Sequence, residues 1–273
     1  MTAGGLRGLI TDPNGATVAD ATVRATNGAT GITSEATSTS AGVYVIGSLP
    51  VGQYHVEAQA SGFKTSVTED VQIYTGTVST LNIALQIGEI KQTVEVKETV
   101  TPLLQTTTSE VSTNVEAHVV MDLPLELSGD RRQVESFVFL TPGVTGSTFS
   151  KSFNGSPDLS QVAVVDGIAF SNAEVPGRFY TYAPPFEAVE EFKVSSTLYP
   201  AELGRGFGVA NYTLKSGTNQ YHGDVFEFLR NDKLDARGFF ASARPIVRQN
   251  EFGGTIGGPI FKNRTFFFAA YDG

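Results

Sequence analysis

The residues that most often perform catalysis are few in this chain and widely separated. Three histidines occur, His55, His118 and His222, and none lies at metal-ligand spacing from another histidine or an acid. The chain has no cysteine, which excludes a thiolate metal site and a disulfide framework. We therefore expect no bound metal, with His55 and His118 as surface residues.

The adjacent acids Glu190 and Glu191 suggest a carboxylate pair for general acid and base chemistry. They lie in FEAVEEFKV, which predicts a short helical turn running into a strand, and adjacent residues on a helical turn do not face each other. Asp166–Gly167 and Lys215–Asn219 have the composition of turns. The sequence also lacks the nucleophile elbow, the P-loop and the HExxH motif. We therefore expect that the chain has no catalytic or cofactor-binding residues and that the protein is not an enzyme.

The segment Ser171–Pro185 contains the residues best suited to contact a ligand. Arg178 offers a guanidinium group, and Phe179, Tyr180 and Tyr182 offer rings on which a sugar or a peptide can stack. These four are the candidate substrate-contact residues. The alternative is that the rings pack against a neighbouring wall of the protein.

The composition favours a chain of many short strands. Hydrophobic residues make up 40%, charged residues 17%, and 29 of the 273 residues are glycine, a mixture typical of strands joined by tight turns. The net charge of −9 argues against a general electrostatic interaction with nucleic acid. No apolar run reaches the ~18 residues of a membrane helix, although the strands of a membrane barrel give a weaker signal. The opening MTAGGLRGLI lacks a signal-peptide pattern, and we expect the true N-terminus to lie upstream.

Between Gly5 and Leu85, short apolar runs alternate with turns and predict a small antiparallel β-sandwich. In QYHVEAQA, Tyr54 and Val56 should face the core while His55 and Glu57 face outward. The phrases ITDPNGATVADATV, GVYVIGSLPVGQYHV and ASGFK closely resemble the carboxypeptidase regulatory-like domain. That resemblance implies a transthyretin-like, immunoglobulin-like sandwich and says little about a ligand.

The clearest helix signal follows a Thr- and Val-rich connector. Asp130 can cap a helix, and Gln133 stands three residues later, as a capping box requires. The helix would place three apolar residues on one face, namely Val134, Phe137 and Val138.

From Leu123 to Gly273, a series of segments resembles the plug and first barrel strands of a TonB-dependent outer-membrane receptor, of the Oar-like subgroup with an N-terminal regulatory-like domain. In order, they are LPL, RRQVESFVFLTPGV, SFNG, VVDG, FEAVEEFKV, YPAELGRGFGVANYTLKSGTNQYHG, FEFLRNDKLDARGFF and RQNEFGGTIGGPIFKNRTFFF. The aromatic- and glycine-rich end, Tyr221–Gly273, would form the opening strands of a barrel, because an unpaired edge of this kind invites aggregation. Phe252, Gly254 and Ile256 would then face lipid, and Gly253, Thr255 and Gly257 the lumen. Lys262–Arg264 would form a short turn into the next strand, Thr265–Tyr271.

The resemblance implies three parts: a sandwich at residues 1–88, a linker with the plug domain at 89–219, and the first strands of a truncated barrel at 220–273. The fold class is therefore mainly β: a transthyretin/Ig-like β-sandwich, an α+β plug, and barrel strands. His222 would lie near the junction of plug and barrel. We expect an N-terminal fragment of a transporter in the outer membrane of a Gram-negative bacterium, with the sandwich in the periplasm.

A TonB box is a short extended segment that the energised inner-membrane partner pulls, and Thr93, Val94, Glu95 and Val96 are the candidates for it. An exposed Thr/Val segment can add as a strand to a partner's sheet edge through backbone hydrogen bonds. The alternative is that Thr93–Val96 is simply the first strand of the plug.

The implied function is energised uptake of a large substrate, such as an oligosaccharide or a peptide, with the TonB–ExbB–ExbD complex and outer-membrane lipid as partners. The alternative is a cell-surface module that binds carbohydrate or protein and is anchored in the outer membrane without transport.

Overall fold

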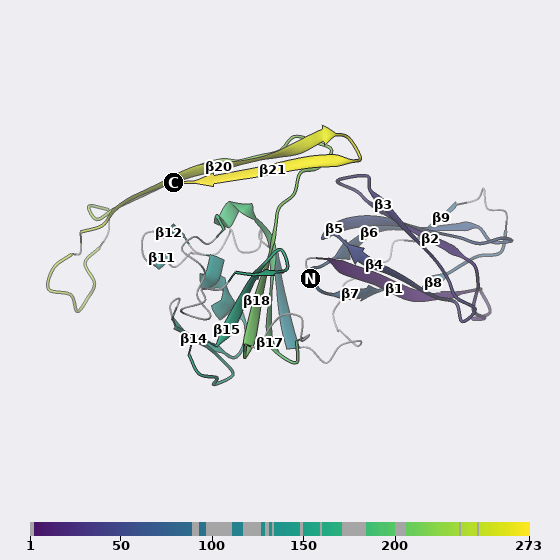
Figure 1. Ribbon diagram of the computed structural model, residues 1–273, viewed down its shortest axis with the longest axis horizontal. Helices are drawn as coiled ribbons and strands as arrows, with labels where there is room; N and C mark the ends of the chain where they lie inside the picture. Colours follow the sequence, from purple (N-terminus) through teal and green to yellow (C-terminus); the bar gives the residue numbers. More distant parts are fainter. Residues whose placement is uncertain are drawn as a thin grey trace.

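The computed structural model describes the protein as three β-rich parts (Figure 1). The described residues are 3–88, 93–96, 111–116, 127–128, 131–132, 134–147, 150–158, 160–170, 184–199, 206–234, 236–244 and 246–273. Among them, no helix has the length and apolar character needed to span a membrane.

The N-terminal part is a sandwich of two sheets, as the sequence predicts, but it is not purely antiparallel, because three of its strand pairings are parallel. The first sheet has the order β4-β1-β7, with β8 also on β1 (β1 Gly4–Thr11, β4 Val43–Leu49, β7 Val78–Thr80, β8 Ile83–Ala84). The second has the order β3-β2-β5-β6-β9 (β2 Thr22–Asn27, β3 Thr33–Thr37, β5 Gly52–Gln59, β6 Thr65–Ile73, β9 Thr93–Val96). Along β5, Tyr54 and Val56 are buried and His55 and Glu57 are half-buried, which confirms the predicted alternation.

The backbone of Leu81 lies directly against β1 at the sandwich core. Leu6 and Ile10 of β1 pack against Val23, Tyr44 and other apolar side chains of the two sheets. Gly8, between them, has no room for a side chain, because a Cβ there would lie 1.7 Å from the carbonyl oxygen of Leu81.

The middle part is built on a mixed five-stranded sheet of the order β10-β17-β18-β15-β16. These strands are β10 Val111–Glu116, β15 Gln161–Val165, β16 Ile168–Ala169, β17 Val189–Thr197 and β18 Gly208–Leu214. Smaller elements accompany it: β11 Leu127–Ser128, β12 Arg131–Arg132, β13 Val144–Ser147, β14 Ser150–Phe153 and the 3₁₀ helices η1 Val134–Leu140 and η2 Phe186–Ala188. One face of the sheet carries a second core, in which the rings of Phe137 and Phe186 lie 5.5 Å apart.

Two local predictions for this part need correction. The helix expected after Asp130 is the 3₁₀ helix η1, which begins at Val134, although Phe137 and Val138 are buried on its inner side as expected. Glu190 and Glu191 lie on strand β17 instead of a helical turn, at a register shift between β17 and β18, and Glu190 is exposed whereas Glu191 is buried. The conclusion that they do not form a catalytic pair is unchanged, for this different reason.

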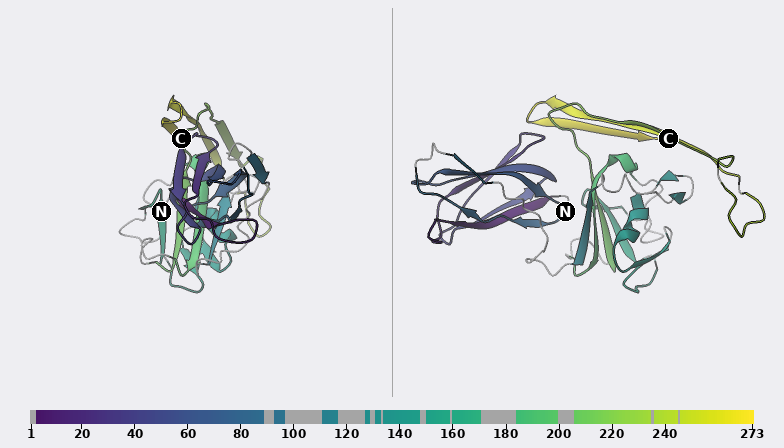
Figure 2. Two further views of the ribbon diagram at one scale, coloured as in Figure 1. Left: turned by 90° about the vertical axis from the view of Figure 1, so that its right-hand side faces the viewer. Right: turned by 180° about the vertical axis from the view of Figure 1, so that it is seen from behind.

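The C-terminal part is a long antiparallel ribbon of β19 (Val225–Asn231), β20 (Arg248–Phe261) and β21 (Thr265–Asp272). The β20–β21 turn at Lys262–Arg264 is the predicted one, with Asn263 in the left-handed region at φ 60°. Figures 1 and 2 show the ribbon along one side of the molecule, with this turn beside the tip of the β2–β3 hairpin of the sandwich.

Candidate functional site

The candidate TonB-box segment, Thr93–Val96, forms strand β9 at the edge of the second sandwich sheet. It runs parallel to β6, with Thr93 opposite Thr65 and Val96 opposite Thr68. The sheet order leaves β9 as the outermost strand, so one side of its backbone has no strand partner among the described residues. Strand β9 belongs to the sandwich sheet, whereas the alternative interpretation made this segment the first strand of the plug.

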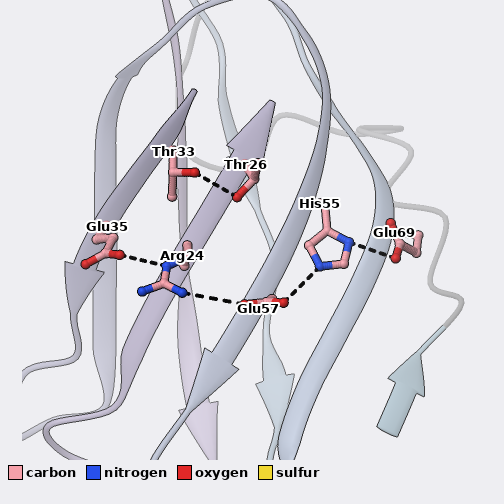
Figure 3. Close-up of polar contacts among 7 residues, drawn as sticks. All are labelled: Arg24, Thr26, Thr33, Glu35, His55, Glu57 and Glu69. Atoms are coloured by element: carbon pink, nitrogen blue, oxygen red, sulfur yellow. Dashed lines mark hydrogen bonds and ion pairs between the residues drawn. The ribbon is translucent and has the colours of Figure 1, made fainter. Parts of the chain in front are cut away.

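On the same sheet, a row of charged side chains crosses the outer face, which is drawn in Figure 3. The Nε of Arg24 donates to Glu35 at 2.7 Å, and its Nη1 lies 4.0 Å from Glu57. His55 lies 3.2 Å from Glu57 through Nε2 and 2.7 Å from Glu69 through Nδ1. Opposite charges on neighbouring strands stabilise their pairing.

A β-bulge in β6 lies beside Glu69, which is the last residue of this row and the partner of His55. The pairing of β5 with β6 shifts register around His55, and Asp70 of β6 adopts φ 58°. Burial lowers the pKa of His55, but hydrogen bonds and charge from Glu69 and Glu57 outweigh it and raise the pKa above its usual value. Within the described residues, no group of three or more His, Asp or Glu side chains has the arrangement of a metal site. The row therefore reads as cross-strand pairing that favours a protonated histidine.

The four candidate substrate-contact residues, Arg178, Phe179, Tyr180 and Tyr182, lie outside the described residues, as does His118. Their role stays a prediction.

The chain leaves the plug for the ribbon at Lys215–Asn219, a predicted turn. Gly217 lies against the ribbon, because a Cβ there would be 2.3 Å from the carbonyl oxygen of Phe267. His222 then exchanges backbone hydrogen bonds of 2.9 and 2.8 Å with Gly257 of β20. The structure thus places His222 where plug and ribbon join.

One buried ion pair in the plug was not foreseen. The Nζ of Lys151 on β14 lies 2.8 Å from a carboxylate oxygen of Glu135 on η1, and both side chains are almost fully buried. Sequence spacing gives no signal for it, because the partners lie on different elements that meet only in the folded plug.

On β20, exposed apolar side chains alternate with a buried polar one. Phe252 and Ile256 of β20 are 49% and 53% exposed, whereas Thr255 between them is buried. Phe252 also contacts Tyr271 of β21, with ring centroids 6.3 Å apart. A strand that alternates in this way is typical of an outer-membrane barrel, with apolar residues toward lipid.

Comparison with known proteins gives matches at both ends of the chain. Residues 5–86 match the carboxypeptidase regulatory-like domain, and residues 213–273 match an outer membrane beta barrel domain. The TonB-dependent transporter Oar of Myxococcus xanthus is 27% identical over 245 residues, which cover 84% of this chain and 23% of that protein. The siderophore receptor PirA from Acinetobacter baumannii is a structural neighbour, with 20% identity, a TM-score of 0.43, and coverage of 59% of this chain and 24% of that chain.

Proposed function

We propose that the chain belongs to an Oar-like TonB-dependent receptor of the Gram-negative outer membrane. On this premise, the protein serves energised uptake of a large substrate. The similarity to a transporter along most of the chain supports a transport role in preference to catalysis. The chain spans about a quarter of the length of that relative, so the activity, substrate and partners of the whole protein all belong to the proposal.

The observation that carries the proposal is the edge strand Thr93–Val96. It is the last strand of the sandwich along the chain and precedes the plug strand β10, and one side of its backbone lies at the edge of the sheet. A partner can add a strand there through backbone hydrogen bonds. We infer that this partner is TonB of the TonB–ExbB–ExbD complex, and that the sandwich therefore lies in the periplasm.

The proposed substrate is an oligosaccharide or a peptide. The proposal rests on the side-chain chemistry of Arg178, Phe179, Tyr180 and Tyr182, which together supply one cation and three aromatic rings. Their joint replacement by alanine should lower substrate affinity and leave TonB binding unchanged.

The test is binding of purified TonB periplasmic domain to the native protein in detergent or lipid. Deletion of Lys91–Lys97 should abolish binding, and one of Val94→Pro and Glu95→Pro should weaken it at least tenfold, because adjacent strand residues point their N–H groups to opposite edges and proline removes the one on the open edge. Val94→Ala keeps that N–H and is the matched control, with binding close to wild type.

Binding that survives the deletion would overturn the proposal and favour a surface-binding module without transport. Such a module would keep its carbohydrate or protein ligand when Lys91–Lys97 is removed, and cells would show no TonB-dependent uptake.

A further inference from the structure

The loop Tyr74–Thr77 of the sandwich lies against the plug sheet. It follows directly after β6, and Thr75 within it is completely buried. The backbone N–H of Thr75 donates to both carboxyl oxygens of Glu191, at 3.1 and 3.3 Å. The Thr75 hydroxyl lies 2.6 Å from the hydroxyl of Thr213. Strands β17 and β18 of the plug thus hold one loop residue by three polar contacts.

Two more contacts belong to this interface. The Nζ of Lys193 donates to the carbonyl oxygen of Gly76 at 2.9 Å, and the side-chain amide of Asn114 donates to the Thr77 hydroxyl at 3.4 Å. Glu191 and Lys193 are two residues apart on β17, so they share a face of the plug sheet. Both are at least 96% buried, because their relative exposures are 1% and 4%.

That face is the one turned away from the plug core. Phe192 and Val194 alternate with the two charged residues and pack into the core on the other side. A charged side chain is seldom buried unless polar partners surround it. The sandwich loop supplies such partners, and the arrangement therefore has the character of a built interface.

The sandwich also touches the rest of the chain at a second place, the β2–β3 hairpin. The backbone N–H of Asn219 donates to the carbonyl oxygen of Ala29 at 2.9 Å. Asn219 also exchanges hydrogen bonds with Asn263 of the β20–β21 turn, through its Nδ2 at 2.7 Å and its Oδ1 at 2.8 Å. One contact would allow the sandwich to pivot, but two separated contacts fix its orientation.

The path of the chain links this interface to the candidate TonB-box strand. Strand β9 pairs with β6 along four residues, and β6 ends at Ile73, immediately before the docked loop. A load on β9 therefore enters β6 and reaches β17 through the contacts of Thr75 and Gly76.

We propose that loop Tyr74–Thr77 is a docking element that joins sandwich and plug into one body, so that a pull on Thr93–Val96 is delivered through β6 to β17. This inference rests on the proposed function for its source of force. The docking itself is independent of that function and is measured separately.

Docking is tested by electron–electron distance measurement on the native protein. Spin labels at Val45→Cys in the sandwich and Ile168→Cys in the plug occupy exposed positions, 61% and 70% respectively. The wild-type background should give one narrow distance distribution, and Thr75→Val combined with Glu191→Gln should broaden it. Glu190→Gln, the exposed neighbour, is the matched control and should stay narrow. A broad wild-type distribution, or an unchanged one in the double variant, would overturn the proposal.

Transmission is tested by pulling the protein in a supported bilayer through bound TonB periplasmic domain. Wild type and a disulfide-locked Thr77→Cys/Asn114→Cys protein should give the same force–extension curve up to plug displacement. An early extension in wild type that the disulfide abolishes would show that the sandwich detaches first, and would overturn the proposal.

The unlocked Thr75→Val/Glu191→Gln protein should show that early extension. Failure of TonB to bind any of these proteins would refute the proposed function and, with it, the transmission part of this inference. The distance distributions would still decide whether the sandwich is docked.

Discussion

Replacing Ile256 by lysine should destabilise the protein in its membrane by about 2–4 kcal/mol, the expected effect of a lysine on the lipid face at the bilayer midplane. Ile256 lies midway between Phe252 and Ile260 on the exposed face of β20, and all three are about half exposed. Four residues rise about 13 Å along a strand, or about 9 Å along the bilayer normal at a tilt of about 45°. Ile256 therefore falls near the centre of an apolar band about 25 Å tall.

Asn250 provides the matched control on the same face of the same strand. It lies about 20 Å from Ile256 along β20, and so about 14 Å higher, beyond the edge of the apolar band. Lysine at this position should destabilise by about 0–1 kcal/mol.

The assay is the folded fraction of the native protein in lipid vesicles over a urea series, read from the gel mobility of unheated samples. Equal losses for Ile256→Lys and Asn250→Lys, or no loss at Ile256, would refute the assignment of this face to lipid.

Three further outcomes are expected, each measured by urea unfolding. Lys151→Met should destabilise the plug by about 3–5 kcal/mol, because it removes the ammonium group 2.8 Å from the buried Glu135 carboxylate, and adding Glu135→Leu should recover much of the loss; a single variant as stable as wild type would contradict this. Tyr44→Phe should destabilise the sandwich by about 1–3 kcal/mol, since its hydroxyl donates to the buried Leu81 carbonyl at 2.7 Å. His55→Gln should lose stability relative to wild type below about pH 6.5, and the difference should shrink as the pH rises through the raised pKa of the folded state; a pH-independent difference would exclude that linkage.

Local signals in the sequence predicted local structure well. The alternation around His55 has a period of two, which only a strand satisfies when one face is buried, and the structure confirms it. The turn at Lys262–Arg264 was predictable because asparagine tolerates the left-handed conformation that the turn requires. The mainly β class, with a sandwich followed by barrel-type strands, is likewise confirmed.

What the sequence could not reveal depends on contacts between distant segments. The capping signal at Asp130 predicted a helix but neither its start nor its geometry: Arg131–Arg132 form strand β12, and the helix is a 3₁₀ helix that begins at Val134. The partner of β9 and the position of Thr75 against Glu191 depend on how domains meet. No periodicity around Thr75 encodes a partner that lies 116 positions away in the chain.

The meeting point of Ala29, Asn219 and Asn263 has a practical consequence for anyone who wishes to follow this protein in living cells. Hairpin tips are common choices for epitope or fluorescent insertions, because they tolerate added length. Here the tip beside Ala29 is occupied: a Cβ added at Gly31 would come within 2.4 Å of the Asn263 side chain. A reporter should instead go into the Asp12–Gly15 turn, where a Cβ added at Gly15 would meet no atom within 4 Å.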